Sequence, residues 1–145
     1  MEQLLAQVPQ QIVNGITLGS VYALLALGYS MVYGVLKMLN FAHGNVFMAG
    51  AFAGWAILSL FQRSGLIAIP ALALAAMALA AIAATALLGA AIERFAYRPL
   101  RGGSRLAPLI SALGVSIILE NAAMLLTSGR AKAIPTELLI PQDMV

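Results

Sequence analysis

The sequence contains no cysteine, and only 9% of its 145 residues are charged. Without cysteine the chain cannot form disulfides or cysteine-ligated metal sites, although this says nothing about its compartment. A soluble domain carries roughly 25% charged residues. Here hydrophobic residues make up 62% of the chain, and the mean hydropathy is +0.96. The shortage of charge therefore predicts an integral membrane protein.

Signatures of catalysis and cofactor binding are also missing. The chain has one histidine, His43, and its carboxylates are scattered, so we expect no metal site. No phosphate-binding G-x-x-x-x-G-K-[ST] loop is present, and no serine or cysteine lies in a setting that would make a nucleophile of it. We expect neither enzyme activity nor a cofactor bound by this chain. The N-terminal "MEQLLAQVPQQ" lacks a positive region and a cleavage site, so we expect no removable signal peptide.

Four stretches are apolar enough to cross a bilayer core about 30 Å thick, which takes roughly 20 helical residues. They cover residues 12–36, 45–61, 66–92 and 106–126; the second is short and the third is rich in alanine. In lipid the backbone must satisfy its own hydrogen bonds, and barrel strands would alternate polar and apolar residues, which these stretches do not. We predict an all-α integral membrane fold, with about four transmembrane helices belonging to a larger polytopic bundle.

The positive residues predict the orientation of the helices. The connection over residues 93–105 contains four arginines, and placing it in the cytoplasm puts Lys37 there too, five positive residues against three on the other side. We therefore expect an external N-terminus and an external tail over residues 128–145. This clustering also explains the net charge of +3 and the pI near 9.7 without nucleic acid.

Small and aromatic residues mark faces of the first two predicted helices. Gly15 and Gly19, and likewise Gly50 and Gly54, are spaced four apart, a pattern that favours close helix packing. Tyrosines share the face of the first glycine pair. That tyrosine face either lines a passage or, at the membrane surface, anchors the helix.

Glu120 lies near the middle of the last predicted span, where an ionised carboxylate costs about 2.5–3.5 kcal/mol on insertion scales. Ser116, Ala123 and Thr127 share its face, and Asn121 lies roughly opposite. A helix that is polar on two sides cannot have a broad lipid face, so we expect it inside a larger bundle. Glu120 is then either neutralised by protonation or a neighbouring helix, or used in transport.

The stretch "LKMLNFAHGNVFMAG" separates the first two apolar runs and holds Asn40, His43 and Asn45. It is either a loop at the headgroup level or a break in the helix at depth. The predicted second helix has 17 residues, about 25 Å, so helix could begin near Asn40, which would serve as an N-cap. A break at depth is tolerated only against protein or water.

Longer segments carry a family resemblance. The stretch "NGITLGSVYALLALGYSMVYGVLKMLNFAHGNVFMAGAF" strongly resembles the start of the LIV-type permeases, the membrane subunits of bacterial ATP-binding-cassette importers for branched-chain amino acids. "IERFAYRPLRG", "RLAPLISALGVSIILEN" and "SGRAKAIP" continue the resemblance in the same order, over residues 11–135.

The resemblance implies a subunit of the bacterial inner membrane that imports hydrophobic amino acids delivered by a periplasmic binding protein. Its implied partners are a second homologous permease and two cytoplasmic ATPase subunits, which use the ATP. Family members are about twice as long, and nothing here matches their ATPase-coupling segment. We therefore expect residues 1–145 to be an N-terminal half that alone neither stimulates the ATPase nor supports uptake. The family commonly has glutamine in place of Glu120, which weakens a need for its charge.

Two alternatives stay open. A related permease could carry urea, amides or other amino acids, and a small membrane scaffold would not transport at all. An open reading frame after Val145 with further spans would favour the permease. Polarity inside a membrane bundle nominates seven residues to line a transport pathway: Tyr22, Tyr29, Asn40, His43, Asn45, Glu120 and Asn121.

Overall fold

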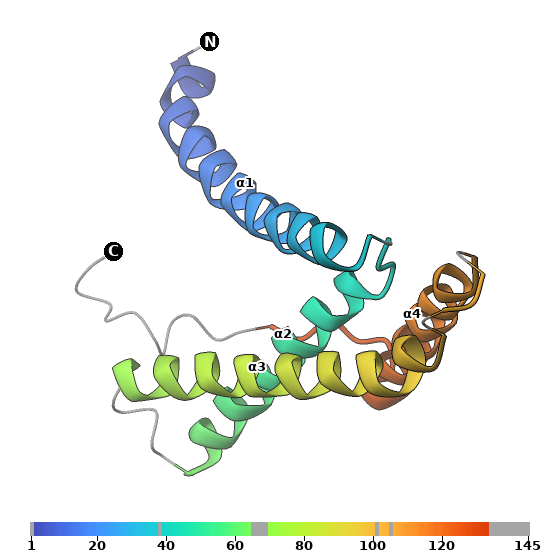
Figure 1. Cartoon of the computed structure of the whole chain (residues 1–145). Coiled ribbons are helices and arrows are strands. Elements are labelled where there is room, and N and C mark those ends of the chain that lie inside the picture. The colour runs from blue at the N-terminus through green and yellow to red at the C-terminus, as the bar shows by residue number, and fades with distance from the viewer. Residues whose placement is uncertain (1, 38, 65–69, 101, 105, 134–145) are drawn as a thin grey trace. The chain divides into compact units, whose positions relative to one another are not determined.

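A computed structural model describes residues 2–37, 39–64, 70–100, 102–104 and 106–133. These residues form four α-helices, shown in Figure 1: α1 (Glu2–Leu36), α2 (His43–Ser64), α3 (Pro70–Ile92) and α4 (Leu106–Thr127). A π-helix, η2 (Glu93–Tyr97), and a 3₁₀-helix, η3 (Arg98–Leu100), continue α3. Four helical segments are long and apolar enough to cross a membrane. The predicted all-α membrane fold is confirmed.

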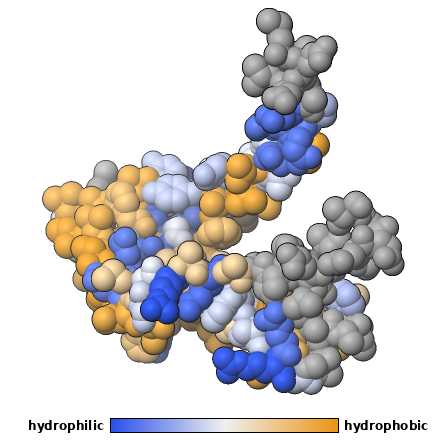
Figure 2. Space-filling view, turned by 180° about the vertical axis from the view of Figure 1, so that it is seen from behind, coloured by the Kyte–Doolittle hydropathy of each residue, from blue (hydrophilic) through white to orange (hydrophobic). Residues whose placement is uncertain are grey.

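The surface of these helices is largely apolar. Leu126, Leu125 and Phe95 are 86%, 80% and 79% exposed, and Figure 2 shows broad hydrophobic areas on the face that it presents. Water would disfavour so much exposed apolar surface, because monomeric soluble proteins rarely expose large contiguous apolar patches. Lipid and neighbouring helices are the surroundings that suit this surface.

The chain divides into two compact units, and the first, Met1–Asn40, consists of α1. This helix begins well before the apolar run at residue 12, because Glu, Gln, Leu and Ala are good helix formers whatever their polarity. It ends at Lys37, whose φ of 55° is left-handed. The Lys37 N–H donates to the Tyr33 carbonyl at 2.8 Å, which is the single hydrogen bond of an αL helix end.

In the second unit, Phe41–Val145, α2 packs closely against α3. Gly50 is buried, and a Cβ built on it would lie 2.7 Å from Cγ2 of Thr85. One turn later, a Cβ on Gly54 would lie 3.8 Å from the carbonyl oxygen of Met77. Because the α3 partner moves back as the α2 residue moves forward, the two helices run antiparallel. Glycine is what allows the two backbones to approach this closely.

The segment after α3 differs from the predicted loop over residues 93–105. Its first eight residues are helical, since η2 and η3 extend α3 to Leu100. The widened π-helical turn is stabilised by α4, where the Ser111 hydroxyl donates to the Ala96 carbonyl at 3.0 Å. The connection contains a turn at Gly102, whose φ is +97°, and then Ser104, whose hydroxyl accepts from the Leu106 N–H at 3.3 Å as a helix cap.

Helix α4 ends in a Schellman motif. Ser128 and Gly129 have φ values of 54° and 64°, and the Gly129 N–H donates to the Met124 carbonyl at 3.1 Å. The described residues 128–133 follow this helix end. Residues 134–145 of the predicted external tail lie outside the described residues.

Candidate functional site

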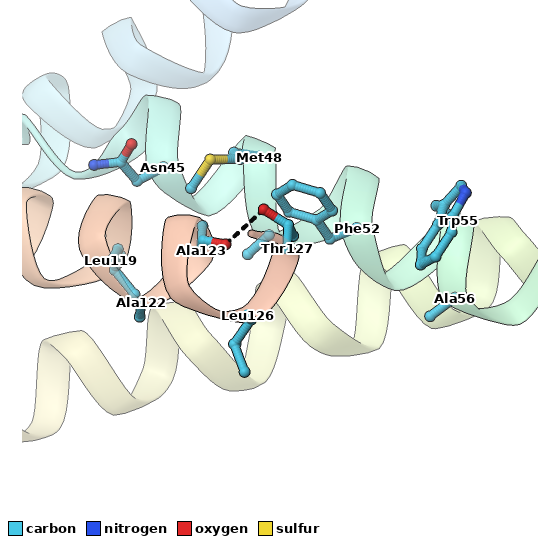
Figure 3. Close-up of a pocket in the computed structure, with 11 residues that line it drawn as sticks. Asn45, Met48, Phe52, Trp55, Ala56, Leu119, Ala122, Ala123, Leu126 and Thr127 are labelled. Carbon is cyan, nitrogen blue, oxygen red and sulfur yellow. Dashed lines mark hydrogen bonds between the residues drawn. The ribbon is translucent and has the colours of Figure 1, made fainter. Parts of the chain in front are cut away.

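A pocket of about 380 Å³ lies between α2 and α4. Figure 3 shows its lining side chains, which come from one stripe on each helix. The α2 stripe is Asn45, Met48, Ala49, Phe52, Trp55 and Ala56, and the α4 stripe is Leu119, Ala122, Ala123, Leu126 and Thr127. The size falls within the roughly 300–1,000 Å³ of small-molecule sites, and a mostly apolar wall with few polar groups is typical of them.

Asn45 joins the two helices at one end of the pocket. Its side-chain nitrogen lies 2.8 Å from the Ser116 carbonyl oxygen and 2.7 Å from the Ser116 hydroxyl. A carbonyl oxygen can only accept, so the amide group must point its N–H donors at Ser116. The remaining group of Asn45, the Oδ1 oxygen, is an acceptor.

This contact also fixes the offset, along the helix axis, between the first residue of α2 and the first residue of α4. Asn45 is two residues from the start of α2, whereas Ser116 is ten residues from the start of α4. Figure 3 shows the two helices running in the same direction, from Asn45 toward Trp55 and from Leu119 toward Thr127. At 1.5 Å per residue, α2 therefore begins about 12 Å beyond the start of α4. The start of α2 consequently lies beside the body of α4.

The break itself is short. Phe41 and Ala42 form a turn, and the Val46 N–H donates to the Ala42 carbonyl at 2.9 Å, so regular helix starts at His43. With 22 residues, α2 is about 33 Å long, enough to cross a bilayer core without Asn40. The role of Asn40 as an N-cap stays a prediction.

Two further polar residues, Thr127 and Lys132, contact residues that line the pocket. The Thr127 hydroxyl donates to the Ala123 carbonyl at 2.8 Å, as Figure 3 shows, which leaves the lone pairs of its oxygen as acceptors. The Lys132 ammonium lies 4.9 Å from the centroid of the Trp55 ring, a cation–π contact. The pocket thus has an apolar wall with the Thr127 hydroxyl beside Met48 and Phe52 (Figure 3), and Trp55 at one end also contacts Lys132.

The predicted pathway residues belong to both units of the chain. Asn45 lines the pocket, and His43 is half-buried at the first residue of α2. Tyr22, Tyr29 and Asn40 belong to the first unit. Within that unit Tyr22 is exposed, whereas Tyr29 and Asn40 are partly buried. Their role stays a prediction.

Glu120 and Asn121 are exposed on α4 and do not line the pocket. The Asn121 side chain donates to the Ile117 carbonyl of its own helix at 2.8 Å. Other residues of the helix face predicted to include Glu120 lie at the pocket. Ala123 and Thr127 line it, and Ser116 accepts a hydrogen bond from the Asn45 side chain. The role of Glu120 and Asn121 in a pathway also stays a prediction.

The glycine pairs differ in their surroundings. Gly50 and Gly54 lie in the α2–α3 contact, whereas a Cβ on Gly15 or Gly19 would have no atom within 4 Å in the structure. Packing at Gly15 and Gly19 stays a prediction. Among the described residues no group of three His, Asp or Glu side chains could hold a metal ion.

Several pocket residues were not singled out from the sequence. Met48, Phe52 and Trp55 follow Asn45 at helical spacing on one face of α2, but every residue around them is apolar too, so hydropathy alone does not distinguish this stripe. Lys132 is one of the three positive residues that the predicted orientation places outside. Its contact with Trp55 joins positions far apart in the chain.

The four spanning helices define a multi-pass membrane protein. A sequence model of the branched-chain amino acid transport system permease component matches residues 11–134. The chain belongs to this family, and the resemblance stated from the sequence is confirmed.

Similarity to individual curated proteins supports the same family. The chain is 54% identical over 136 residues to the high-affinity branched-chain amino acid transport system permease protein BraD of Pseudomonas aeruginosa. It is 46% identical over 127 residues to the permease protein LivH of Escherichia coli, and equally to LivH of Salmonella typhimurium. The matches cover 94% and 88% of this chain but 43% and 41% of the relatives, so the chain spans less than half their length. No solved structure matches this chain.

Proposed function

We propose that this chain forms part of the permease of an ATP-binding-cassette importer for branched-chain amino acids in the bacterial inner membrane. The observation that carries the proposal is the similarity over 94% of the chain, at 54% identity, to a permease protein of a high-affinity branched-chain amino acid transport system. At this identity we expect the four helices to have the same fold as the corresponding helices of that permease, since the match includes the helices and their connections.

The proposed partners follow from this role. They are a second homologous permease, two cytoplasmic ATPase subunits and a periplasmic amino-acid-binding protein. The ATPase subunits hold and hydrolyse the ATP, and this chain binds no cofactor. The chain supplies helices between which the amino acid passes when hydrolysis changes their arrangement.

The orientation in this proposal places the N-terminus in the periplasm and the connection between α3 and α4 in the cytoplasm. Exposed Arg94 and Arg98 in η2 and η3 support it, because positive residues remain on the cytoplasmic side. In this orientation α2 begins about 12 Å from the cytoplasmic start of α4. The break before His43 then lies within the membrane, as broken helices do where they line a transport path.

The pathway residues of the proposal are the seven polar candidates, and Asn45 is the one of them that lines the α2–α4 pocket. Alanine substitution of a pathway residue should lower uptake at normal expression. Unchanged uptake removes that residue from the pathway and leaves the permease assignment intact.

Deletion of the gene in its bacterium tests the function. We expect the high-affinity uptake of radiolabelled leucine, isoleucine and valine to be lost, and to return when the gene is supplied on a plasmid. Unchanged uptake of all three, in a strain without a second such system, contradicts the proposal. Loss of urea or amide uptake instead would contradict the proposal that the substrates are branched-chain amino acids.

A further inference from the structure

We propose that Arg94, Phe95 and Arg98 form a binding site for the headgroup of an anionic phospholipid in the cytoplasmic leaflet. All three residues are exposed, and they lie in η2 and η3, the helical continuation of α3. This inference goes beyond the proposed function, because it concerns the lipid around the protein and not the transported amino acid. It takes only the choice of leaflet from the proposed orientation.

The length of α3 places this segment at the level of the lipid headgroups. The helix has 23 residues, none of them charged, and is therefore about 35 Å long. The hydrocarbon core of a bilayer is about 30 Å thick. The first charged residues, Glu93 and Arg94, follow directly after the helix, where the core ends. A partner confined to the cytoplasm would meet residues farther from the core, whereas lipid headgroups lie at this depth.

Contacts with α4 and within η2 hold the segment in place. The Ser111 hydroxyl of α4 donates to the Ala96 carbonyl at 3.0 Å, and Figure 1 shows the end of α3 beside α4. The Tyr97 side chain is buried, at 4% exposure. The Arg98 N–H donates to the Glu93 carbonyl, which closes the turn. Because this turn is fixed, its exposed side chains keep their spacing when a ligand binds.

The exposed side chains suit a phosphate next to an apolar chain. Arg94 and Arg98 are four residues apart, close to one full helical turn, so they lie on about the same side. Guanidinium groups present paired N–H donors that match the oxygens of a phosphate. Phe95 is 79% exposed, and an apolar ring at the boundary of headgroups and acyl chains is buried among lipid.

The charge of the turn favours an anionic lipid over a zwitterionic one. Glu93, the neighbouring carboxylate, is half-buried, so the exposed charge is positive. Phosphatidylglycerol has no cation to oppose its phosphate, whereas the ammonium of phosphatidylcholine would lie near the arginines and be repelled. Each basic residue near an anionic membrane surface favours binding by about fivefold.

Native mass spectrometry of the complete transporter in detergent tests the site. The complex is titrated with dioleoyl phosphatidylglycerol or with dioleoyl phosphatidylcholine. Arg94→Gln and Arg98→Gln should each weaken the tightest phosphatidylglycerol site about fivefold and leave phosphatidylcholine binding unchanged. Each single variant keeps four positive residues on the predicted cytoplasmic side against three on the other, so we expect the orientation to be retained.

Matched variants separate this site from a general effect of charge or of ring removal. Arg63→Gln removes an exposed arginine in the last turn of α2 and should leave the tight site unchanged. Phe95→Ala should weaken the binding of both lipids, whereas Phe47→Ala, at a position 50% exposed, should not. Unchanged binding in both Arg94→Gln and Arg98→Gln, or an equal loss in Arg63→Gln, overturns the inference.

A spin label on Phe95→Cys, with the transporter assembled in nanodiscs, distinguishes lipid from a protein partner. We expect the label to be accessible to oxygen, which is concentrated in lipid, and to a nickel chelate carried on lipid headgroups. Burial against an acidic surface of an ATPase subunit would shield the label from both reagents and overturn the inference. None of these readouts is amino acid uptake. A transporter that binds phosphatidylglycerol here but imports no branched-chain amino acid contradicts the proposed function and leaves this site standing.

Discussion

Asn45, near the start of α2, donates its side-chain amide to both the carbonyl and the hydroxyl oxygen of Ser116, in the middle of α4, at 2.8 and 2.7 Å. This is a long-range polar contact between two spanning helices. It closes one end of the pocket and places the start of α2 beside the body of α4. Both features depend on a side chain with two N–H donors at position 45.

Asn45→Ala removes this contact. We expect the free energy of unfolding in detergent micelles to fall by about 1 kcal/mol, within the range measured for hydrogen bonds between membrane helices. Asn45→Asp should lower it further, because a carboxylate oxygen would face the Ser116 carbonyl. Titration with a denaturing detergent, followed by circular dichroism, measures the change.

Asn121→Ala is the matched control for stability. Its amide bonds only to Ile117 of the same helix, at an exposed position. The control should shift the transition by a few tenths of a kcal/mol at most, as exposed substitutions do. If both alanine variants shift it equally, Asn45 does not join the helices.

Gly50→Ala tests the close approach of α2 and α3. Its Cβ would lie 2.7 Å from Cγ2 of Thr85, a β-branched side chain whose hydroxyl is bonded to the Ala81 carbonyl at 2.8 Å. Because that side chain cannot turn away without losing its bond, we expect a loss of about 1–3 kcal/mol in the free energy of unfolding.

Thr85→Ser provides the complement, since it removes Cγ2 and keeps the hydroxyl. In the double variant the clash is absent, so the two changes together should cost about 1 kcal/mol less than their sum. Gly89→Ala, where a Cβ meets no atom within 4 Å, should be neutral or stabilising by up to about 1 kcal/mol. A Gly50→Ala variant as stable as Gly89→Ala contradicts the packing.

The sequence predicted that four apolar helices exist, but it predicted less well the residues at which each helix begins and ends. Long apolar runs show where lipid is favoured, and α4 follows its run closely. Hydropathy does not report backbone hydrogen bonding, so it missed the polar helical turns before residue 12 and the helical residues 93–100. The second case depends on Ser111, which bonds the Ala96 carbonyl from another helix, and no local pattern shows that bond.

The candidate site was predictable only in part. Asn45 stood out because a polar side chain in an apolar run requires a partner, and the partner is Ser116. The pocket depends on how α2 and α4 lie side by side, and the contact between Lys132 and Trp55 joins a residue after α4 to a residue of α2. These are tertiary contacts between distant positions, which one sequence does not reveal.

Single cysteines test the orientation, because the sequence has no other thiol. A membrane-impermeant maleimide should label Gln7→Cys from the periplasmic side of spheroplasts. It should label Ser104→Cys, in the turn before α4, only in inverted vesicles or after permeabilisation. The reverse pattern contradicts the external N-terminus, and both variants must retain normal expression for the comparison.

Leucine accumulation in proteoliposomes tests the central claim most directly. The permease subunits and their ATPases are reconstituted together, the binding protein and radiolabelled leucine are supplied on its side of the membrane, and ATP on the other. The account predicts that leucine accumulates against its gradient and that this accumulation requires ATP. Excess isoleucine or valine should abolish the accumulation, and excess urea should not. Accumulation that is unchanged when this subunit is left out would contradict it.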